Sequence, residues 1–402
     1  MVAWGLKNRG HQPIGLDIGH NSVKMIQLLI NEEQISVIAA DETRIDAVAN
    51  SDEQSRRICI ISAIRRMLAN GGFQGRNVVS CLPSDKLKIT SLRLAEVERY
   101  DIEQALRREV AQRFGLDPDK DSMDYMVAGS VRQGDEVKNE LILFATDNET
   151  IKDHISTLEQ ADLRPVAIDT IPCALFRSFE RSLRRQEDRD RTAVFVDVGS
   201  FFTTVVFGRG GEISFIKQIQ IGGQKFASEI AAKLGISVAE AEMLQESLRV
   251  DPGLLSLKSD VSEWAPAENW HNIDMSTRQV MVDAVSAVAE DLVREISLCL
   301  RYYTVTFRGK RVERAVFAGG GAYEDILLNI LKRKLAVEIE LAQPLRGFDL
   351  SNGRIKVNFD SDRRGMFCEW AVAVGLGLKG WNRMAGDEHQ AKYELRECYE
   401  RN

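Results

Sequence analysis

The sequence has few cysteines and histidines, and none of them is spaced as in a metal site. The six cysteines are scattered without a C-x-x-C pair, and no two of the five histidines have the spacing of paired ligands on a helix. A structural zinc site needs clustered thiolates or imidazoles, so this spacing excludes one. Because dispersed thiols favour a reducing compartment, we expect a cytoplasmic protein.

Long hydrophobic runs and an excess of positive charge are also missing. The longest apolar run, at residues 371–378, is far shorter than the roughly 20 residues that cross a bilayer, and the N-terminus lacks a signal-peptide core. The polar tail at 381–402 has no basic amphipathic stripe for lying on a membrane. A net charge of -7 argues against nucleic acid, because phosphate contacts need a basic face. We expect a soluble protein without direct membrane insertion or a nucleic-acid partner.

The sequence does contain an internal repeat. Residues 14–26 and 194–206 each read as an apolar strand, an Asp-apolar-Gly turn, a few polar residues and a second strand. Asp17 of the first copy matches Asp197 of the second at a constant offset. A chain of 402 residues is too long for one ordinary core, and its two halves begin near these hairpins. The repeat therefore predicts two duplicated lobes that face each other.

The remaining sequence pattern divides the chain into two lobes, an inserted subdomain and a tail. A stretch of mixed charge at residues 181–191 is the predicted boundary between the lobes. Apolar side chains at spacings of three and four from Met281 to Tyr303 predict a long core helix in the second lobe. The predicted bounds are 1–83 for the first lobe, with 165–192 and 360–380 returning to it; 84–164 for a small inserted α+β subdomain; 193–359 for the second lobe, with a loop insertion at about 251–278; and 381–402 for the polar tail.

The two hairpin turns have the composition of a phosphate-binding site. Tight turns of small residues let backbone N–H groups cradle phosphate oxygens, and magnesium prefers one or two carboxylates together with several waters. Asp17 and Asp197 would stand at the bases of the turns, and Lys24 could reach a phosphate as a point charge. The other candidates are Gly19, His20, Asn21 and Ser22 in the first turn, and Gly199, Ser200 and Thr203 in the second.

A third glycine-rich element follows an apolar strand in the second lobe. It consists of Gly319, Gly320 and Gly321, and the lack of side chains would let the backbone approach a flat base closely. A plain strand-to-helix turn is the alternative, although three consecutive glycines exceed what such a turn requires. Gly222 and Gly223 give a similar but less specific signal.

The order of phosphate turn, inserted subdomain, second phosphate turn and triple glycine resembles the superfamily of actin, heat-shock chaperones and sugar kinases. Within it the sequence is similar to the PilM family of type IV pilus assembly proteins, which are related to the division protein FtsA. The resemblance implies an actin-like (ribonuclease H-like) two-lobed α/β fold with an inserted subdomain in the first lobe. The segments that carry it are residues 14–28, 106–129, 172–178, 196–204, 221–230 and 371–378.

This resemblance implies an ATP site with Mg²⁺. Asp17 and Asp197 would hold the metal, directly or through water, and Asp197 would also be catalytic. The turn residues and Lys24 would contact the phosphates, and the triple glycine would lie under the adenosine. Glu242 and Gln245 match a Glu-x-x-Lys pair that meets the ribose in relatives, with a neutral glutamine in place of the lysine.

The segment that connects the lobes departs from its relatives. Heat-shock-type ATPases carry a glutamate just before a proline there, and Ile171 occupies that position. A residue that orients water must be polar and within hydrogen-bond reach. Asp169 could substitute as a catalytic residue, or it could only end its strand. We therefore expect slow hydrolysis at most.

The resemblance also implies a partner. Members of the PilM family are cytoplasmic scaffolds that dock the short cytoplasmic N-terminal peptide of a single-span membrane protein, PilN. The groove would lie between the first lobe and the subdomain at residues 84–164, which places the protein at the inner face of the inner membrane. An FtsA-like division protein and a small-molecule kinase are the alternatives, and the sequence leaves homo-oligomers open.

Overall fold

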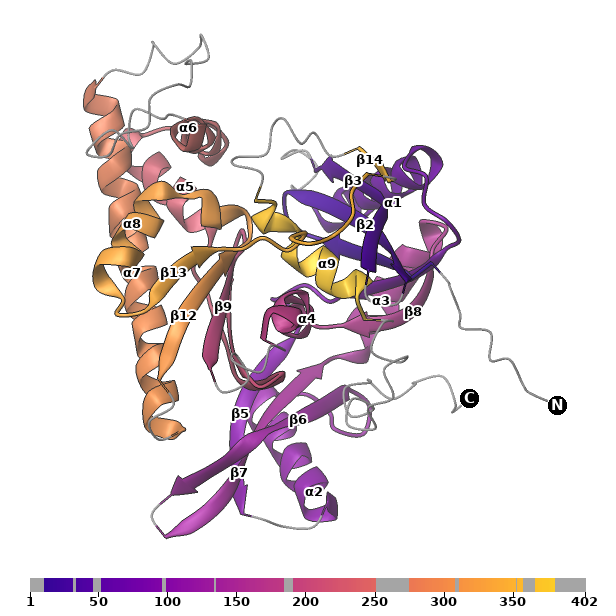
Figure 1. The fold of residues 1–402 in the computed structure, drawn as a ribbon, viewed down its shortest axis with the longest axis vertical. Coiled ribbons are helices and arrows are strands. Elements are labelled where there is room, and N and C mark those ends of the chain that lie inside the picture. The colour runs from indigo at the N-terminus through magenta and orange to yellow at the C-terminus, as the bar shows by residue number, and fades with distance from the viewer. Residues whose placement is uncertain are drawn as a thin grey trace, which may run out of the picture.

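The described part of the chain, in this computed structural model, folds into three β-sheets surrounded by helices (Figure 1). The predicted tail at 381–402, most of the predicted insertion at 251–278 and residues 184–190 of the charged stretch lie outside this part. None of the helices described here combines the length and the hydrophobicity needed to cross a bilayer. The described residues are 11–31, 34–45, 52–95, 99–133, 135–183, 191–250, 275–307, 311–351, 353–356 and 366–379.

The first sheet has the order β14-β3-β2-β1-β4-β8 and contains the first predicted hairpin. Strands β1, β2 and β3 are antiparallel, whereas β4 and β8 run parallel to β1 on its other side. The carboxyl ends of β1, β4 and β8 therefore lie at one edge of the sheet. The bounds are β1 (Ile14–Ile18), β2 (Ser22–Asn31), β3 (Gln34–Arg44), β4 (Asn77–Cys81), β8 (Arg164–Asp169) and β14 (Arg354–Ile355).

Helices α1 (Glu53–Asn70) and α3 (Asn148–Gln160) pack against one face of this sheet. Each begins at an aspartate cap: Asp52 accepts a hydrogen bond from the N–H of Ser55 at 2.8 Å, and Asp147 accepts one from the N–H of Thr150 at 2.7 Å. Such caps satisfy donors that the first helical turn leaves free. The core under the helices includes Ile14, Leu16, Val23, Met25, Ile64, Met67 and Leu158.

The second sheet has the order β11-β10-β9-β12-β13 and repeats the design of the first. Strands β9, β10 and β11 are antiparallel, and β12 runs parallel to β9 as β4 does to β1. The predicted stripe from Met281 to Tyr303 is buried on the long helix α7 (Met275–Thr306). The other bounds are β9 (Thr192–Val198), β10 (Thr203–Arg209), β11 (Glu212–Ile219), β12 (Val312–Ala318), β13 (Glu338–Leu341), α5 (Gly223–Leu234), α6 (Val238–Val250) and α8 (Asp325–Lys334).

Helices α4 (Ile171–Leu183) and α9 (Ala371–Gly377) lie between the two sheets (Figure 1). Helix α9 packs on β1 and β2, whereas α4 packs on β9 and β10. The two helices approach so closely that a Cβ atom on Gly375 would collide with the carbonyl oxygen of Ala174. Only glycine permits this contact, which joins the two halves of the molecule.

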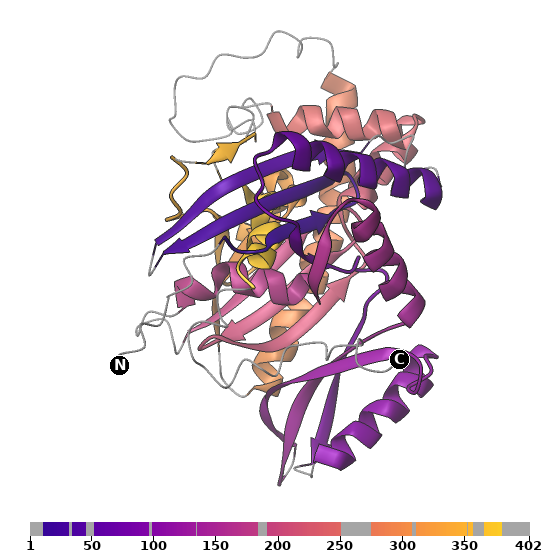
Figure 2. The ribbon, with the colours of Figure 1, turned by 90° about the vertical axis from the view of Figure 1, so that its right-hand side faces the viewer.

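A third sheet is formed by β5 (Lys88–Ala95), β6 (Ser122–Gln133) and β7 (Glu136–Thr146), in the antiparallel order β5-β7-β6. Helix α2 (Arg99–Glu109), which continues into a π-helical turn at Val110–Phe114, covers one face. The opposite face lies against β11 of the second half. The sheet forms the lower end of the molecule in Figure 2.

The short strand β14 lies within the stretch that the sequence assigned to the second lobe, but it pairs with β3 of the first sheet. Just before it, the N–H of Asp349 donates to the carbonyl of Ile35 at 2.8 Å, and the N–H of Val37 donates to the carbonyl of Asp349 at 2.9 Å. The chain thus returns to the first sheet before residue 360. A two-residue strand has no period to detect, so the sequence does not reveal this pairing.

Candidate functional site

The first predicted turn connects β1 to β2, and neighbouring elements hold it from two sides. The N–H of Gly19 donates to the carbonyl of Ser22 at 3.0 Å, which closes the turn across His20 and Asn21. From helix α1, the guanidinium of Arg56 donates to the carbonyls of Gly19 and His20 at 2.7 and 2.8 Å. The turn carbonyls therefore accept hydrogen bonds from a cation that the sequence did not indicate.

Lys24 stands beside Asp17 across the β1–β2 pair and is almost fully buried. Its ammonium donates to the Ser22 hydroxyl at 2.6 Å and forms an ion pair with Glu42 of β3 at 3.2 Å. Burial opposes its charge, but Glu42, Asp17 and Glu369 raise its pKa above the ordinary value. Lys24 thus remains charged at the base of the first turn.

The second predicted turn has the same hydrogen bond at the matching place. The N–H of Gly199 donates to the carbonyl of Phe202 at 3.0 Å, and the hydroxyl of Thr203 donates to the carbonyl of Ile221 at 2.7 Å. Equivalent residues of the two hairpins therefore adopt equivalent turns.

Helix α5 begins directly against this second turn. The N–H groups of Gly223 and Gln224 donate to the carbonyls of Gly199 and Ser200 at 2.9 and 2.8 Å. A Cβ atom on Gly222 would lie 2.5 Å from the carbonyl oxygen of Ser200, so this approach requires glycine. The positive end of the helix dipole therefore lies beside the turn.

The two turns meet across the two halves of the molecule. The ring of His20 contacts the ring of Phe201 edge to face, with centroids 4.5 Å apart and planes at 78°. Burial, and then the charge of Arg56, lower the pKa of His20, which favours the neutral imidazole. The duplicated hairpins thus face each other, as the sequence predicted.

The two aspartates at the bases of the turns lie within electrostatic range of each other. Burial raises the pKa of Asp197 to about 7; Asp17 adds to this rise, whereas Lys24 opposes it. Burial also raises the pKa of Asp17, against the opposing charge of Lys24. The thiol of Cys81, at the end of β4, has its pKa raised by burial and by Asp17, Asp169 and Asp197. The charges of Asp17, Asp169 and Asp197 therefore all act on the end of β4.

This donor set fits a magnesium ion. The two aspartates are partly buried, and their raised pKa values show that little positive charge nearby stabilises their ionised forms. A divalent cation would supply that charge. In the described part of the chain no three His, Cys, Asp or Glu side chains are grouped as a metal site. A site with two carboxylates nevertheless suits Mg²⁺, because this ion usually keeps several waters and binds phosphate oxygens as well.

The triple glycine follows β12 and packs against the end of β9. Gly319 has a φ of 83°, and a Cβ atom there would lie 2.5 Å from Oδ1 of Asp197. A Cβ atom on Gly321 would collide with the Val198 side chain, whereas one on Gly320 would meet nothing within 4 Å. Gly319 and Gly321 are thus required by packing on β9, and Gly320 leaves open space where a ligand could approach.

Glu242 and Gln245, on helix α6, both interact with residues of the second half. Glu242 accepts a hydrogen bond from the Gln224 side chain, in the first turn of α5. The buried Gln245 donates to the carboxylate of Glu324 at 3.1 Å, just after the triple glycine. The pair therefore connects the start of α5 with the glycine loop.

Asp169, the predicted substitute for the missing glutamate, is almost fully buried and paired with two cations. Its carboxylate lies 2.8 Å from Arg177 of α4 and 3.5 Å from Lys379, which follows α9. Burial opposes its ionisation, but Arg177 and Lys379 hold its pKa below the ordinary value. A carboxylate with two cationic partners is a weak base. The geometry therefore favours a structural role for Asp169, in which its ion pairs hold β8, α4 and the end of α9 together, over a catalytic role in orienting water.

Glu369 is a site residue that the sequence did not indicate. It accepts a hydrogen bond from the hydroxyl of Tyr323 at 2.5 Å, and its charge contributes to the raised pKa of Lys24. The backbone carbonyl of the preceding residue, Cys368, accepts a hydrogen bond from the N–H of Gly319 at 3.0 Å. The segment before α9 thus brings a carboxylate beside the glycine loop and within electrostatic range of Lys24. Nothing in its local pattern distinguishes it from a surface glutamate.

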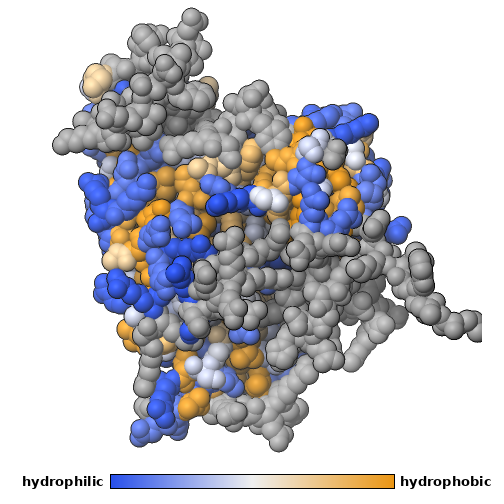
Figure 3. Space-filling model, in the orientation of Figure 1, coloured by the Kyte–Doolittle hydropathy of each residue, from blue (hydrophilic) through white to orange (hydrophobic). Residues whose placement is uncertain are grey.

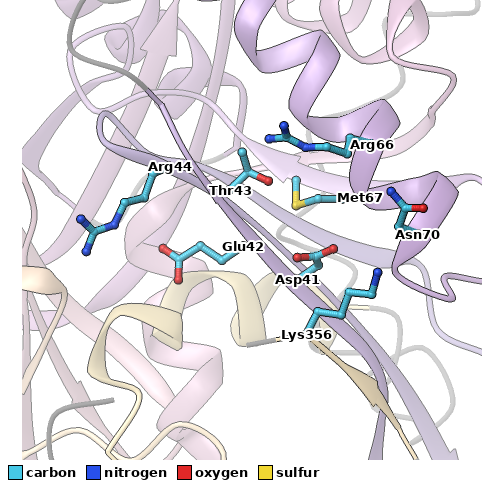
Figure 4. Close-up of a pocket in the computed structure, with 8 residues that line it drawn as sticks. All are labelled: Asp41, Glu42, Thr43, Arg44, Arg66, Met67, Asn70 and Lys356. Atoms are coloured by element: carbon cyan, nitrogen blue, oxygen red, sulfur yellow. The ribbon is translucent and has the colours of Figure 1, made fainter. Parts of the chain in front are cut away.

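A cavity of about 420 Å³ lies at the end of β3, next to the first turn (Figure 4). Glu42 lines the cavity and also pairs with Lys24, so the cavity borders the predicted site without coinciding with it. Burial raises the pKa of Asp41 in its wall. The lining residues are Asp41, Glu42, Thr43, Arg44, Arg66, Met67, Asn70 and Lys356.

Two halves with the same sheet design, each with an aspartate-bearing turn facing the other, define an actin-like, two-lobed α/β protein. A glycine loop beside the second aspartate completes the design. The chain belongs to the family of the type IV pilus assembly protein PilM, whose model matches residues 15–250 and 267–381. The family and the fold class predicted from the sequence are both confirmed.

The chain is similar to several solved structures. One described as the "PilM-PilN type IV pilus biogenesis complex" is 20% identical with a TM-score of 0.71, covering 92% of this chain and 99% of that chain. The ethanolamine utilization protein EutJ from Carboxydothermus hydrogenoformans is 13% identical with a TM-score of 0.49, covering 92% and 89%. A protein of Bacteroides thetaiotaomicron described as having an "actin-like ATPase fold" is 9% identical with a TM-score of 0.38, covering 86% and 95%.

Proposed function

We propose that this protein is a Mg-ATP-binding scaffold of a type IV pilus, or related, assembly platform at the inner membrane. The observation that carries the nucleotide site is the meeting of two duplicated turns. His20 and Phe201 are in contact across the halves. The charge of Asp17 also contributes to the raised pKa of Asp197, so the aspartates of the two turns lie within electrostatic range. A triphosphate between facing turns needs this arrangement.

Each part of the site has a distinct task in this proposal. Asp17 and Asp197 hold Mg²⁺, which supplies positive charge to the phosphates. Lys24 adds a fixed cation at the first turn, and the start of α5 adds a helix dipole at the second. The open space at Gly320 receives the adenosine. The remaining predicted contacts with the phosphates come from backbone groups of the turns other than the N–H groups of Gly19 and Gly199, which close the turns.

The protein acts as a scaffold in this proposal, with slow hydrolysis at most. Ile171 cannot orient a water molecule, and Asp169 is held by Arg177 and Lys379. A base that lowers the barrier must have its lone pair directed at the water, with a pKa near the working pH. The second condition is not met at Asp169, because Arg177 and Lys379 lower its pKa.

The partner in this proposal is a PilN-like membrane protein, bound through its cytoplasmic N-terminal peptide. Family membership supports it, as does the fold shared with a chain from a PilM-PilN complex. The third sheet offers the edge strands β5 and β6, along which an extended peptide can form main-chain hydrogen bonds. Its exposed valines, Val127 and Val137, add hydrophobic surface, and Figure 3 shows hydrophobic residues among hydrophilic ones on this end of the molecule. The protein would reach the inner face of the membrane through this partner.

Titration of the purified protein with Mg-ATP tests the nucleotide site. Asp17→Ala and Asp197→Ala should each lower the affinity at least tenfold, because a magnesium ligand is lost. Asp41→Ala is the matched control, since Asp41 lies in the wall of the neighbouring cavity. Unchanged affinity in Asp17→Ala would remove the site. A turnover rate above about one per second, within the usual range of enzymes, would contradict the scaffold role.

A further inference from the structure

The third sheet is inserted into the first half in sequence, but it shares its core with the second half. Met126 of β6 and Phe144 of β7 belong to the same buried cluster as Phe215 of β11. Phe307, which follows α7, also belongs to this cluster and approaches Gly129 of β6. The interior of the second half therefore continues into the third sheet.

A cluster of polar side chains connects the third sheet to helix α7 at the edge of this interface. Glu140 of β7 is fully buried and forms an ion pair with Arg93 of β5 at 2.8 Å. Arg93 also donates to the hydroxyls of Tyr302 and Thr306 on α7, each at 3.0 Å, and the Tyr302 hydroxyl donates to Glu140 at 3.3 Å. A buried carboxylate without partners is costly, so the cluster holds the sheet on α7 in one position. We call these four residues the Glu140 cluster.

Helix α7 connects this cluster to the second turn of the proposed nucleotide site. It packs along α5, whose first N–H groups donate to Gly199 and Ser200. Within its core cluster, Val285, Leu292 and Ile296 of α7 are fully buried. Tightly packed elements of this kind move together, because close-packed interiors resist deformation. The second turn, α5, α7 and the third sheet therefore form one packed unit.

We infer that the third sheet moves with the second half when the halves close on nucleotide, fastened by the Glu140 cluster. The separation between the first half and the edge strands of the third sheet then changes with nucleotide state. A peptide bound along such an edge strand and against the first half would bind with different affinity to the two states, by roughly 5- to 150-fold for typical coupled sites. This inference rests on the proposed function and adds the route by which nucleotide regulates the partner.

Distance measurements between spin labels test whether the third sheet moves with the first half or with the second half. Exposed positions are available on each part: Ser62→Cys on α1, Val137→Cys on β7 and Lys332→Cys on α8. The labels are placed pairwise in the full chain, with the native cysteines that react replaced by alanine. Distances are recorded with and without magnesium and a non-hydrolysable ATP analogue. The inference predicts a changed 62–137 distance and a constant 137–332 distance.

Two variants of the Glu140 cluster and a matched control complete the test. Arg93→Ala removes the side chain that donates to the other three residues of the cluster. Tyr302→Phe removes only a hydroxyl, so it tests the cluster even if Arg93→Ala fails to fold. Both should broaden the 137–332 distance distribution even without nucleotide and weaken the change in the 62–137 distance. Arg107→Ala, in an exposed pair with Asp119 on the α2 side of the same subdomain, should change neither.

The possible results separate this inference from the proposed function. A separate titration records whether the analogue binds, and a lack of binding would refute the nucleotide site itself. Binding with a constant 62–137 distance, or with a changed 137–332 distance, would overturn the inference and leave the nucleotide site intact. Wild-type behaviour of both cluster variants would show that the Glu140 cluster does not hold the sheet.

Discussion

The imidazole of His20 lies edge-on to the ring of Phe201, so a side chain from the turn of one half touches a side chain from the turn of the other. Neither ring belongs to the helices α4 and α9 that join the halves elsewhere. This contact therefore reports how closely the halves approach at the site.

A double-mutant cycle of His20→Ala and Phe201→Ala measures this contact. Edge-to-face aromatic pairs contribute about 0.5–1.5 kcal/mol beyond the burial of their area. We expect a coupling of this size in the free energy of unfolding, from urea titrations of the four proteins. Strict additivity would mean that the rings do not meet in solution.

The glycines of the third motif should differ in their sensitivity to substitution. Gly319→Ala places a methyl group against Asp197 at a positive φ, and we expect it to lower the free energy of unfolding by about 1–3 kcal/mol. Gly320→Ala meets open space and should leave the free energy of unfolding within about 0.5 kcal/mol of wild type. If the adenosine lies against Gly320, Gly320→Ala should lower the Mg-ATP affinity although it leaves the stability unchanged. Normal affinity in a folded Gly320→Ala would place the base elsewhere.

The raised pKa of Asp197 predicts a loss of stability as the pH rises in the absence of ligand. The folded state holds the proton up to about pH 7, whereas the unfolded carboxyl releases it near 3.8. The contribution of this bound proton to the free energy of unfolding is therefore fully present below pH 3.8. It declines as the pH rises and is lost above about 7. Asp197→Asn is neutral at every pH, so its stability relative to wild type should increase from pH 5 to 7 and then level off.

Urea titrations at pH 5, 6, 7 and 8 measure this difference, which should reach the order of a few kcal/mol. Asp119→Asn, at an exposed pair with Arg107 of α2, is the control and should show no such trend. A constant difference between Asp197→Asn and wild type would mean that Asp197 is ionised throughout.

Asp169→Asn should act on stability more than on nucleotide binding. Removing one partner of a buried ion pair costs about 3–5 kcal/mol, because Arg177 and Lys379 are left without their carboxylate. The pKa of Asp169 is lowered, so its contribution is present above the unfolded pKa and is lost as the pH falls through the folded one. Chemical denaturation measures the loss, with Asp119→Asn as a surface control. A stable variant that has lost its residual ATP hydrolysis would instead make Asp169 catalytic.

Much of the site could be predicted from sequence, because its components are local. A hairpin with an aspartate, a glycine turn and alternating apolar residues is specified by about a dozen consecutive residues, and the chain contains two. The burial of the α7 stripe followed from its period alone. The family resemblance added the superfamily and the order of the motifs.

The sequence by itself determined the paired turns, the glycine loop and the alternation of strands and helices, since each depends on neighbouring residues. Only the tertiary structure decided that Arg56 binds the first turn, that Glu42 and Glu369 act on Lys24, and that two cations pair with Asp169. It also decided that the third sheet packs on the second half, because a strand pattern with two apolar faces does not tell which neighbour covers each face. Such contacts join residues far apart in the chain, and no local pattern records them.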